Sequence, residues 1–352
     1  DERRKFMATL IHNSTPTSRT PTFKTPGCST YRNTTEHFFY SNNPEELAYA
    51  HTADSGKWLC RETVSGTVQL YTWHHNKVSV NGVNKSINST ILIYNPNSFA
   101  VDITISNQGV TSMSYNTTGF SDYNAWENYV NSSSAVITVQ SGQYYNIFNR
   151  QIPYNYVFGV VAKIQIKRSG TSTVAGVTLF DIAYVSNSAG ATACAASTDP
   201  LRRRGNGNGF YQTLQFGTLE FANSTPQAYK FAASLEGVFG GDDCSYISDE
   251  SGQASGLLEG GFGQIFVVRL PIKNNFSTSK TFKIFLGSIG GPSFPFAYLG
   301  NDLAKYGQTD ALKYIDIVNL GSIGAGETLT EPFSIVIPAS SATPYIIGAY
   351  PV

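Results

Sequence analysis

The sequence predicts an all-β protein of two tandem β-sandwich domains with jelly-roll or Greek-key connections. Composition, alternation and an internal repeat support this prediction. Charged residues make up only 14% of the 352 residues, whereas the chain holds 21 Tyr and 22 Phe. Aromatic and β-branched side chains favour a pleated sheet, whereas helical bundles are rich in Ala, Leu, Glu and Lys. Short runs of alternating apolar residues bounded by polar turns are typical of half-buried strands.

The second half of the chain repeats the pattern of the first half. Residues 91–105 read as an apolar strand, an Asn-rich turn and an alternating strand, and residues 266–285 repeat this order. Matching points, such as positions 95 and 274, lie 179, 184 and 185 residues apart. A nearly constant separation indicates that one domain plan occurs twice.

The predicted order is an extended arm at 1–35, a first sandwich at 36–190, a linker at 191–209 and a second sandwich at 210–352. The arm holds three prolines and few apolar residues, so it cannot bury enough surface to fold alone. The linker is rich in Ala, Gly and Asn.

Alternation and turn residues place the individual elements. The Asn81-Gly82 pair predicts a tight hairpin turn. Residues 122–130 have aromatic residues at helical spacing and predict a short helix. A second short helix is expected after Asn43, with Pro44 at its first position, and a helical turn near 301–306. The predicted strands are 68–74, 91–94, 101–105, 135–139, 144–148, 157–165, 177–186, 214–221, 263–272, 281–286, 314–318 and 333–337.

The charge of the chain argues against nucleic acid and anionic membranes as partners, and its uneven distribution suggests contact with a second copy of the chain. The chain has 24 basic and 24 acidic residues, which gives no reason to expect nucleic acid or an anionic membrane as a partner. Residues 1–35 hold six basic and two acidic side chains, a net charge of +4, which leaves −4 on the rest. No stretch is long and apolar enough for membrane insertion, and no signal-peptide pattern opens the chain.

Four cysteines, Cys28, Cys60, Cys194 and Cys244, form no Cys-x-x-Cys motif, which argues against a zinc ribbon or a thioredoxin-type site. Three disulfide pairings are open. If the cysteines are oxidised, Cys28–Cys60 would join the arm to the first domain and Cys194–Cys244 would join the linker to the second. Buried free thiols are the alternative.

The densest acidic cluster predicts the one candidate metal site. Asp242, Asp243, Asp249 and Glu250 lie on a Gly-flanked loop and offer the hard oxygen ligands that calcium prefers. The alternative is a solvated loop without an ion, and no other cofactor is expected. No nucleophile elbow and no paired-histidine metal motif occurs, so the chain is not expected to be an enzyme. A glycosidase that uses this loop is the remaining catalytic alternative.

Aromatic residues offer a candidate carbohydrate surface. Tyr71 and Trp73 alternate on one strand, and Tyr123, Trp126 and Tyr129 lie on the predicted helix. They would either stack on sugar rings or pack in the sandwich.

Several motifs carry a resemblance to a known group. They are 39–45 (FYSNNPE), 70–76 (LYTWHHN), 261–268 (GFGQIFVV), the glycine pair at 290–291 and 324–327 (GAGE). Together they resemble secreted Gram-positive (Firmicute) surface proteins of tandem β-sandwich type, which often accompany stalk or cell-wall domains. The resemblance covers residues 37–352 and implies an extracellular or cell-surface location. It implies no activity and no functional residue.

These observations predict an extracellular structural protein that self-assembles with copies of itself into a filament or surface layer, with a capsid as a further form. The arm would add a strand to a sandwich edge of a neighbouring copy, with Leu10, Ile11 and Phe23 in pockets. The alternative to docking on a neighbouring copy is a disordered tail or an arm folded back on its own chain. An adhesin module that binds carbohydrate or cell-wall material is the alternative function.

Overall fold

The computed structural model describes residues 8–25, 28–32, 35–116, 122–186, 195–196, 204–207, 210–231, 246–248, 255–257, 261–339 and 341–352. The fold is all-β, with one α-helix among these residues. They form two compact units. Unit 1 draws its described residues from 1–32, 211–245 and 257–352, and unit 2 from 33–210 and 246–256.

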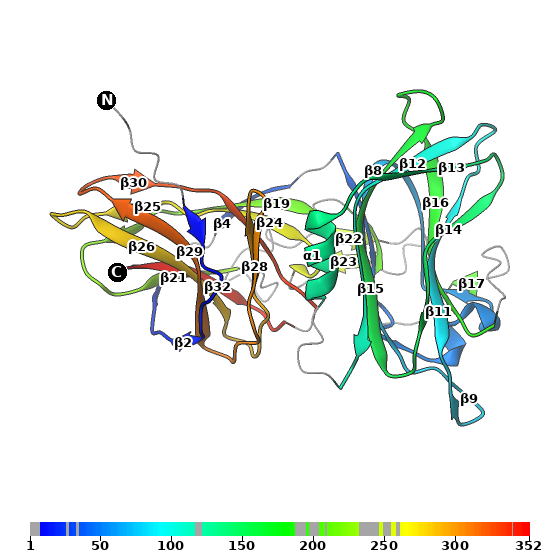
Figure 1. Ribbon diagram of the computed structural model, residues 1–352, viewed down its shortest axis with the longest axis horizontal. Coiled ribbons are helices and arrows are strands. Elements are labelled where there is room, and N and C mark those ends of the chain that lie inside the picture. Colours follow the sequence, from blue (N-terminus) through cyan, green and yellow to red (C-terminus); the bar gives the residue numbers. More distant parts are fainter. Residues whose placement is uncertain are drawn as a thin grey trace. The chain divides into compact units, whose positions relative to one another are not determined.

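Unit 2 is a β-sandwich whose two sheets share one long strand, β8 (Cys60–Asn76) (Figure 1). The first sheet has the order β13 (Ala135–Val139), β12 (Val101–Ser114), β15 (Tyr156–Arg168), β8, β5 (His37–Ser41), β18 (Arg204–Gly207), β22 (Tyr246–Ser248), β23 (Ser255–Leu257). The second sheet has the order β14 (Tyr144–Ile152), β11 (Ile87–Tyr94), β16 (Gly176–Tyr184), β8.

Strand β8 changes sheet at Gly66. Residues 60–65 pair with β16 and residues 66–75 pair with β15. Gly66 has φ +66°, a conformation that side chains with a Cβ rarely adopt, and it allows the bend. The predicted alternation is confirmed here: Val101, Ile103 and Ile105 are buried in the core between the two sheets.

The smaller elements of unit 2 cover its sheets and ends. Helix α1 (Tyr123–Asn131) confirms the predicted helix and packs on β12 and β15 (Figure 1). The Asn81-Gly82 turn is also confirmed. The remaining elements are β6 (Glu46–Leu47), η1 (Tyr49–His51), η2 (Ala53–Ser55), β7 (Lys57–Trp58), β9 (Ser79–Val80), β10 (Val83–Asn84) and β17 (Ala195–Ala196).

Two predicted helical pieces are wrong. The helix expected after Asn43 is absent because Glu46 and Leu47 form β6, which pairs with β8, and Leu47 is fully buried. The helical turn expected at 301–306 is instead β28 (Asp302–Lys305), the second strand of a hairpin with β27 (Phe296–Leu299). In both places tertiary pairing overrides local propensity.

Unit 1 is a second sandwich (Figure 1). One sheet has the order β1 (Thr9–Leu10), β29 (Lys313–Ile323), β26 (Lys280–Ser288), β32 (Tyr345–Pro351), β21 (Gln227–Phe231), β3 (Thr22–Phe23), with β2 (Thr17–Ser18) also on β29. The other has the order β28, β27, β31 (Phe333–Val336), β24 (Ile265–Arg269), β19 (Tyr211–Phe216), β4 (Cys28–Arg32). A short sheet of β20 (Leu219–Phe221), β25 (Ile272–Asn274) and β30 (Thr328–Leu329) continues it.

The division of the chain differs from the predicted boundaries in two places. Strands β1 to β4, in the stretch expected to be a separate arm, belong to the sheets of unit 1. Strand β18, in the stretch expected to be a linker, pairs with β5 in unit 2, and β22 pairs with β18. Backbone pairing gives these polar segments a stability that their own apolar content would not supply.

The internal repeat is confirmed at the level of single hydrogen bonds. In unit 2, Asn95 Nδ2 donates to the carbonyl oxygens of Phe99 and Val139 at 2.8 and 3.0 Å. Its Oδ1 accepts from the N–H of Asn97 at 3.0 Å. The buried side chain therefore satisfies three backbone groups at the turn between β11 and β12.

Asn274 makes the same three bonds in unit 1. Its Nδ2 donates to the carbonyl oxygens of Thr278 and Ile323 at 2.9 and 2.8 Å. Its Oδ1 accepts from the N–H of Phe276 at 2.9 Å. Every partner lies 179 or 184 residues beyond its counterpart in unit 2, which are separations that the sequence pattern predicted.

The strand orders match in the same way. The order β13-β12-β15-β8-β5 in unit 2 corresponds to β29-β26-β32-β21-β3 in unit 1. The last pair is parallel in each unit, β5 with β8 and β3 with β21. The two units therefore share one sheet plan and differ in what lies beyond its ends.

Replacing Asn95 or Asn274 should destabilise the unit that contains it. We expect Asn95→Asp and Asn274→Asp each to lower the free energy of unfolding of its own unit by about 2–4 kcal/mol, because a carboxylate would face two carbonyl oxygens. All three tryptophans (Trp58, Trp73, Trp126) lie in unit 2, so their fluorescence follows unit 2 during urea denaturation, while circular dichroism follows both units.

The matched control is Asn223→Asp. Asn223 is exposed and its Oδ1 only accepts, from the N–H of Thr225, so a carboxylate keeps the bond. Unfolding curves of the two buried variants that match this control would contradict the structural role of the repeated asparagine.

Candidate functional site

The described residues 8–25, here called the N-terminal segment, form the candidate site together with the strands that hold them. The segment first runs antiparallel to β29, at residues 9–10 and 17–18. It then crosses the sheet and lies parallel to β21 at residues 22–23. Both edges of the four strands β29-β26-β32-β21 are thus paired by one extended peptide.

Backbone hydrogen bonds fix the register at each edge. The N–H of Ile11 donates to the carbonyl oxygen of Ile317 at 3.0 Å. At the far edge, the N–H of Lys24 donates to the carbonyl oxygen of Ala228 at 2.9 Å. An edge strand exposes a row of unpaired N–H and C=O groups, and an extended peptide satisfies them without needing a fold of its own.

Apolar contacts hold the beginning of the segment. Ala8 and Leu10 are 7% and 6% exposed and belong to the core of unit 1. Of the three predicted apolar contacts, Leu10 is therefore in the core, Ile11 is half-buried, and Phe23 is 40% exposed beneath the Lys230 ammonium. Phe23 does not fill a pocket, because β3 is the outermost strand of its sheet.

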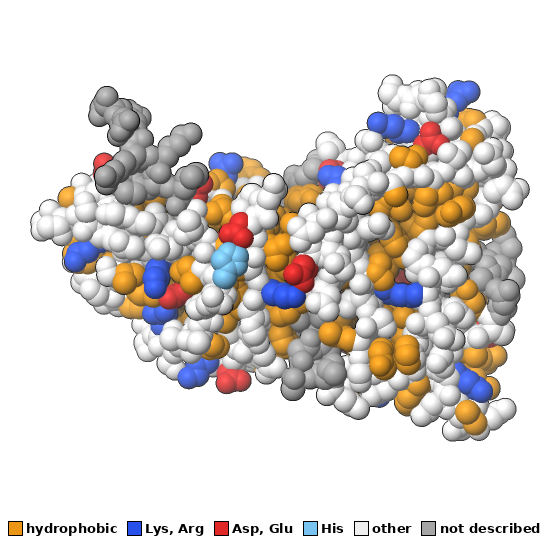
Figure 2. Space-filling model, viewed as in Figure 1, with side chains coloured by type: hydrophobic (Ala, Val, Ile, Leu, Met, Phe, Trp, Pro, Cys, Tyr) orange, Lys and Arg blue, Asp and Glu red, His pale blue; other side chains and the backbone are white. Residues whose placement is uncertain are grey.

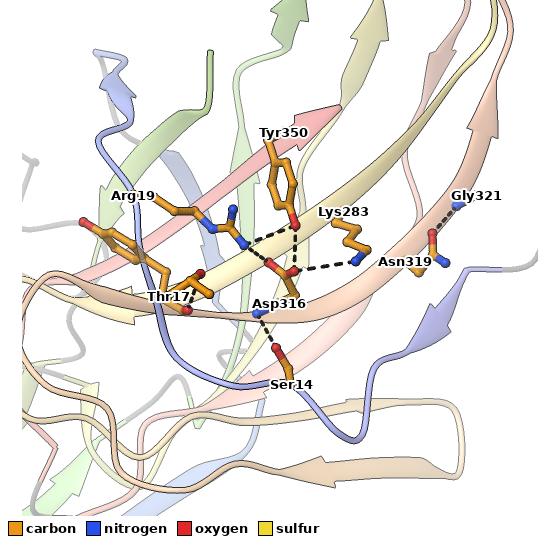
Figure 3. A network of polar contacts seen from close by, with 9 residues as sticks. Ser14, Thr17, Arg19, Lys283, Asp316, Asn319, Gly321 and Tyr350 are labelled. Atoms are coloured by element: carbon orange, nitrogen blue, oxygen red, sulfur yellow. Dashed lines mark hydrogen bonds and ion pairs between the residues drawn. The ribbon is translucent and has the colours of Figure 1, made fainter. Parts of the chain in front are cut away.

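Asp316 of β29 is the polar centre of the site (Figure 3). Arg19 Nη2 donates to its Oδ1 at 2.6 Å, and the Tyr350 hydroxyl donates to its Oδ2 at 2.7 Å. Its own N–H donates to Ser14 Oγ at 3.1 Å, and Lys283 Nζ lies 3.8 Å from Oδ2. Arg19 of the segment and side chains of β26 and β32 converge on the carboxylate, and Ser14 of the segment binds the backbone N–H of the same residue (Figure 3).

Arg19 is held by packing as well as by charge. Its guanidinium lies 4.0 Å from the centre of the Tyr350 ring and 5.5 Å from that of Phe285. The side chains of Arg19 and Asp316 are 15% and 13% exposed. A cation that is shielded from water and stacked on an aromatic face binds its carboxylate more strongly than an exposed pair does.

The Tyr350 hydroxyl stays protonated over the ordinary pH range. Burial raises its pKa to about 12, with the hydrogen bond to Asp316 and the Asp316 charge acting in the same direction and Arg19 opposing them. The phenol can therefore donate its proton to Asp316 throughout that range.

A second polar contact near the start of the segment is weaker. His12 Nε2 lies 3.1 Å from Asp302 Oδ2, and both side chains are about half exposed, at 49% and 51%. Exposed pairs of this kind contribute little. The segment is therefore anchored mainly at Leu10 and Arg19.

Sequence reasoning missed Ser14, Arg19, Asp316 and Tyr350 as site residues. Arg19 entered only the charge count of the arm. The one available signal was Asp316 itself, a lone carboxylate inside an apolar strand that needs a partner. The partner could not be named, because Arg19 and Asp316 are 297 residues apart.

The predicted calcium ligands Asp242, Asp243, Asp249 and Glu250 lie outside the described residues, so calcium binding there stays a prediction. No group of three potential metal ligands occurs in the part of the chain that the structure describes.

Of the cysteines, Cys28 lies on β4 in unit 1 and Cys60 on β8 in unit 2, and they form no disulfide with each other. The residues around Cys28 pair with β19 of unit 1 and not with the first sandwich. Cys194 and Cys244 are not among the described residues.

Of the two interpretations of the aromatic residues, packing in the sandwich is the one that the structure bears out. Tyr71, Trp73, Trp126 and Tyr129 are each less than a tenth exposed, and Tyr123 is half-buried. Tyr71 stacks on Tyr40 at 5.5 Å between ring centres, and Trp126 of helix α1 lies against Tyr71 and against Tyr129 of the same helix. These rings bury the face of the sheet on which the helix lies, so they offer no surface to a sugar.

A buried histidine in unit 2 has neighbours that suggest a catalytic triad but do not form one. His74 Nε2 lies 2.8 Å from Asp181 Oδ2 and 3.4 Å from Ser41 Oγ. Its Nδ1 lies 2.7 Å from the carbonyl oxygen of Pro44. A triad needs the hydroxyl and the carboxylate on opposite ring nitrogens, whereas both lie at Nε2 here.

On the face that Figure 2 shows, a few charged side chains are scattered among hydrophobic side chains and uncharged polar atoms. None of the helices in the described ranges could cross a membrane.

No family model matches the chain, and no curated protein matches it. Among solved structures, it is similar to an oxalate decarboxylase from Lactobacillus farciminis, with 8% identity, coverage of 97% of this chain and 85% of that chain, and a TM-score of 0.12. Vicilin from tomato (Solanum lycopersicum) has 9% identity, 82% and 74% coverage, and a TM-score of 0.13. The coconut allergen cocosin has 7% identity, 96% and 85% coverage, and a TM-score of 0.14. Likenesses at this level carry no argument about function.

The ion pair between Arg19 and Asp316 predicts that unit 1 loses stability when Arg19 is replaced. We expect Arg19→Ala to lower the free energy of unfolding of unit 1 by about 2 kcal/mol, because Asp316 then keeps a shielded charge without its main partner. Arg19→Lys should restore only part of the loss, since an ammonium cannot reproduce the planar stacking on Tyr350. Hydrogen exchange of β29 and β32 measures the effect.

Lys24→Ala serves as the control, because it removes one positive charge from the same segment without touching Asp316. An effect of Arg19→Ala no greater than that of Lys24→Ala would show that general charge, and not this contact, matters.

The raised pKa of Tyr350 predicts that unit 1 loses stability at alkaline pH. A group whose pKa rises on folding stabilises the fold fully below its unfolded pKa, near 10, and loses that contribution as the pH climbs toward about 12. We therefore expect the stability of unit 1 to fall over this interval, and to fall less steeply in Tyr350→Phe. Urea denaturation at a series of pH values compares the slopes, and equal slopes would contradict the assignment.

Proposed function

We propose that this protein is a non-catalytic structural protein that joins copies of itself into a filament or surface layer. The N-terminal segment is the connector. It leaves the sheet of its own chain and completes the same sheet in a neighbouring copy. Each copy thus gives one segment and receives one.

The observation that carries the proposal is the pairing of both edges of the β29-β26-β32-β21 sheet by one extended peptide. The peptide is attached by short runs of backbone pairing, two buried apolar side chains and the contacts at Asp316. All of these are non-covalent. Every copy presents the identical edges, so the bonds made within one chain can equally be made between two.

Exchange of this kind produces an open-ended contact. A donor strand and its acceptor edge are different surfaces, so each link is head-to-tail and propagates unless its rotation closes a ring. Backbone bonds supply geometry, and Leu10 and Arg19 supply the specific contacts. The contrast between a +4 arm and a −4 remainder favours encounter at low salt and weakens as salt rises.

An extracellular or cell-surface location belongs to the same proposal. It is supported by the low content of charged residues and by the resemblance of residues 37–352 to secreted surface proteins of tandem β-sandwich type.

A charge-swap experiment tests the exchange with the full-length chain. Arg19→Glu and Asp316→Arg each place like charges together and should reduce the assemblies that electron microscopy and light scattering detect. Mixing the two variants after mild denaturation should restore assembly, because each donor then meets an acceptor of opposite charge on the other chain. The matched control is Lys24→Glu, which should neither weaken assembly nor be rescued by the Asp316→Arg chain.

The outcome separates the possibilities. If assembly returns only when both substitutions are placed in one chain, the segment stays on its own chain and the proposal is wrong. A wild-type protein that remains a 38.2 kDa monomer at every concentration would contradict it as well.

A further inference from the structure

The shared plan of the two units exposes a difference at one edge. Strand β13 of unit 2 corresponds to the end of β29 in unit 1: Val139 and Ile323 accept the equivalent asparagine bonds and pair with equivalent residues of β12 and β26. In unit 1 the sheet continues past β29 to β1. In the described part of unit 2 it ends at β13, whose one partner there is β12.

The β13 edge also lacks the features that usually protect an edge strand. Residues 131–143 contain no charged residue and no proline, and the strand itself reads Ala-Val-Ile-Thr-Val. Val136 is 63% exposed. Natural sheets block such edges with lysine, proline, bulges or inward-pointing charges.

Two other outer strands carry that protection. Strand β28 begins with Asp302 and ends with Lys305. Strand β3 is followed by Lys24 and lies beneath the ammonium of Lys230, 4.7 Å from the Phe23 ring. Strand β13 carries no such device, which distinguishes it from these two strands.

We propose that β13 is an interaction surface that pairs antiparallel with β13 of a second copy. Centred on Ile137, the pairing places Val136 opposite Thr138 of the other copy and Ala135 opposite its Val139. Alternation is kept, because Ile137 and Val139 pack toward the core and Val136 and Thr138 face outward in both copies. Cross-strand pairs of β-branched residues are favourable, and no like charges meet.

A second copy fits this edge better than another N-terminal segment does. Each chain has one such segment, and β29 and β21 already take it, whether it is donated or kept. The β13 pairing is self-complementary and closes as a two-fold contact, which the head-to-tail exchange does not. It does not depend on the proposed exchange.

The contact is small, so its affinity is expected to be low. Five residues on each side bury much less surface than a standard interface, which gives a weak and concentration-dependent dimer. Where chains are already joined through their N-terminal segments, the same contact would link neighbouring filaments, because a tethered edge has a high effective concentration.

Two double variants of the full chain test the pairing. Val136→Lys with Thr138→Lys puts two lysines opposite each other at both symmetry-related positions, and we expect the dissociation constant of the dimer to rise roughly tenfold or more. Val136→Glu with Thr138→Lys differs only in the sign at position 136 and should restore dimerisation. Sedimentation analysis over a concentration series measures both.

The series is run in wild type and in the Arg19→Glu background, which separates the two contacts. With the exchange weakened, we expect discrete dimers of twice 38.2 kDa that the lysine pair alone abolishes. A monomer in the Arg19→Glu background at all concentrations, or equal behaviour of the two double variants, would overturn the inference. Binding of a peptide of residues 8–25 to β13, blocked by the lysine pair, would assign the edge to the N-terminal segment and would overturn it too.

Discussion

The need to pair the edges of β-sheets governs this structure. A sandwich buries side chains between its two sheets, but each outermost strand still presents backbone N–H and C=O groups that need hydrogen-bond partners. In unit 1 the N-terminal segment supplies those partners at both edges of the β29-β26-β32-β21 sheet. A peptide too polar to form a core of its own thereby becomes part of a core, with Leu10 inserted among the buried residues.

Backbone pairing alone would not place this segment uniquely, because a slip by two residues keeps the same faces. The contacts at Asp316 remove that freedom. The carboxylate lies on a mostly covered face and accepts a hydrogen bond from Arg19, while the backbone N–H of the same residue donates to Ser14 Oγ. Its neighbour Tyr350 completes the arrangement as a hydrogen-bond donor. One charged residue in an apolar strand thus sets the register of the segment.

Duplication and divergence explain the remaining architecture. Asn95 and Asn274 make equivalent bonds, so the turn that organises each sandwich has been kept in both units. The ends of the sheets have not been kept. Unit 1 gains strands at β29 from the N-terminal segment, whereas unit 2 gains strands beyond β5 from β18 and β22. Different edges are therefore left for contacts with other molecules, which is the physical basis of the two self-association contacts that we propose.

The sequence by itself determined the all-β class, the repeat, helix α1 and the alternating strands, because these depend on local spacing and on which side chains favour a pleated sheet. It also indicated that residues 1–35 could not fold alone and that Leu10 would be an apolar contact. Only the tertiary structure decided where that segment lies, that Arg19 meets Asp316, and that Tyr71 and Trp126 are buried rather than displayed. The reason is physical: partners separated by hundreds of residues leave no periodic trace, and an aromatic side chain has the same local pattern whether its face packs on a sheet or on a sugar.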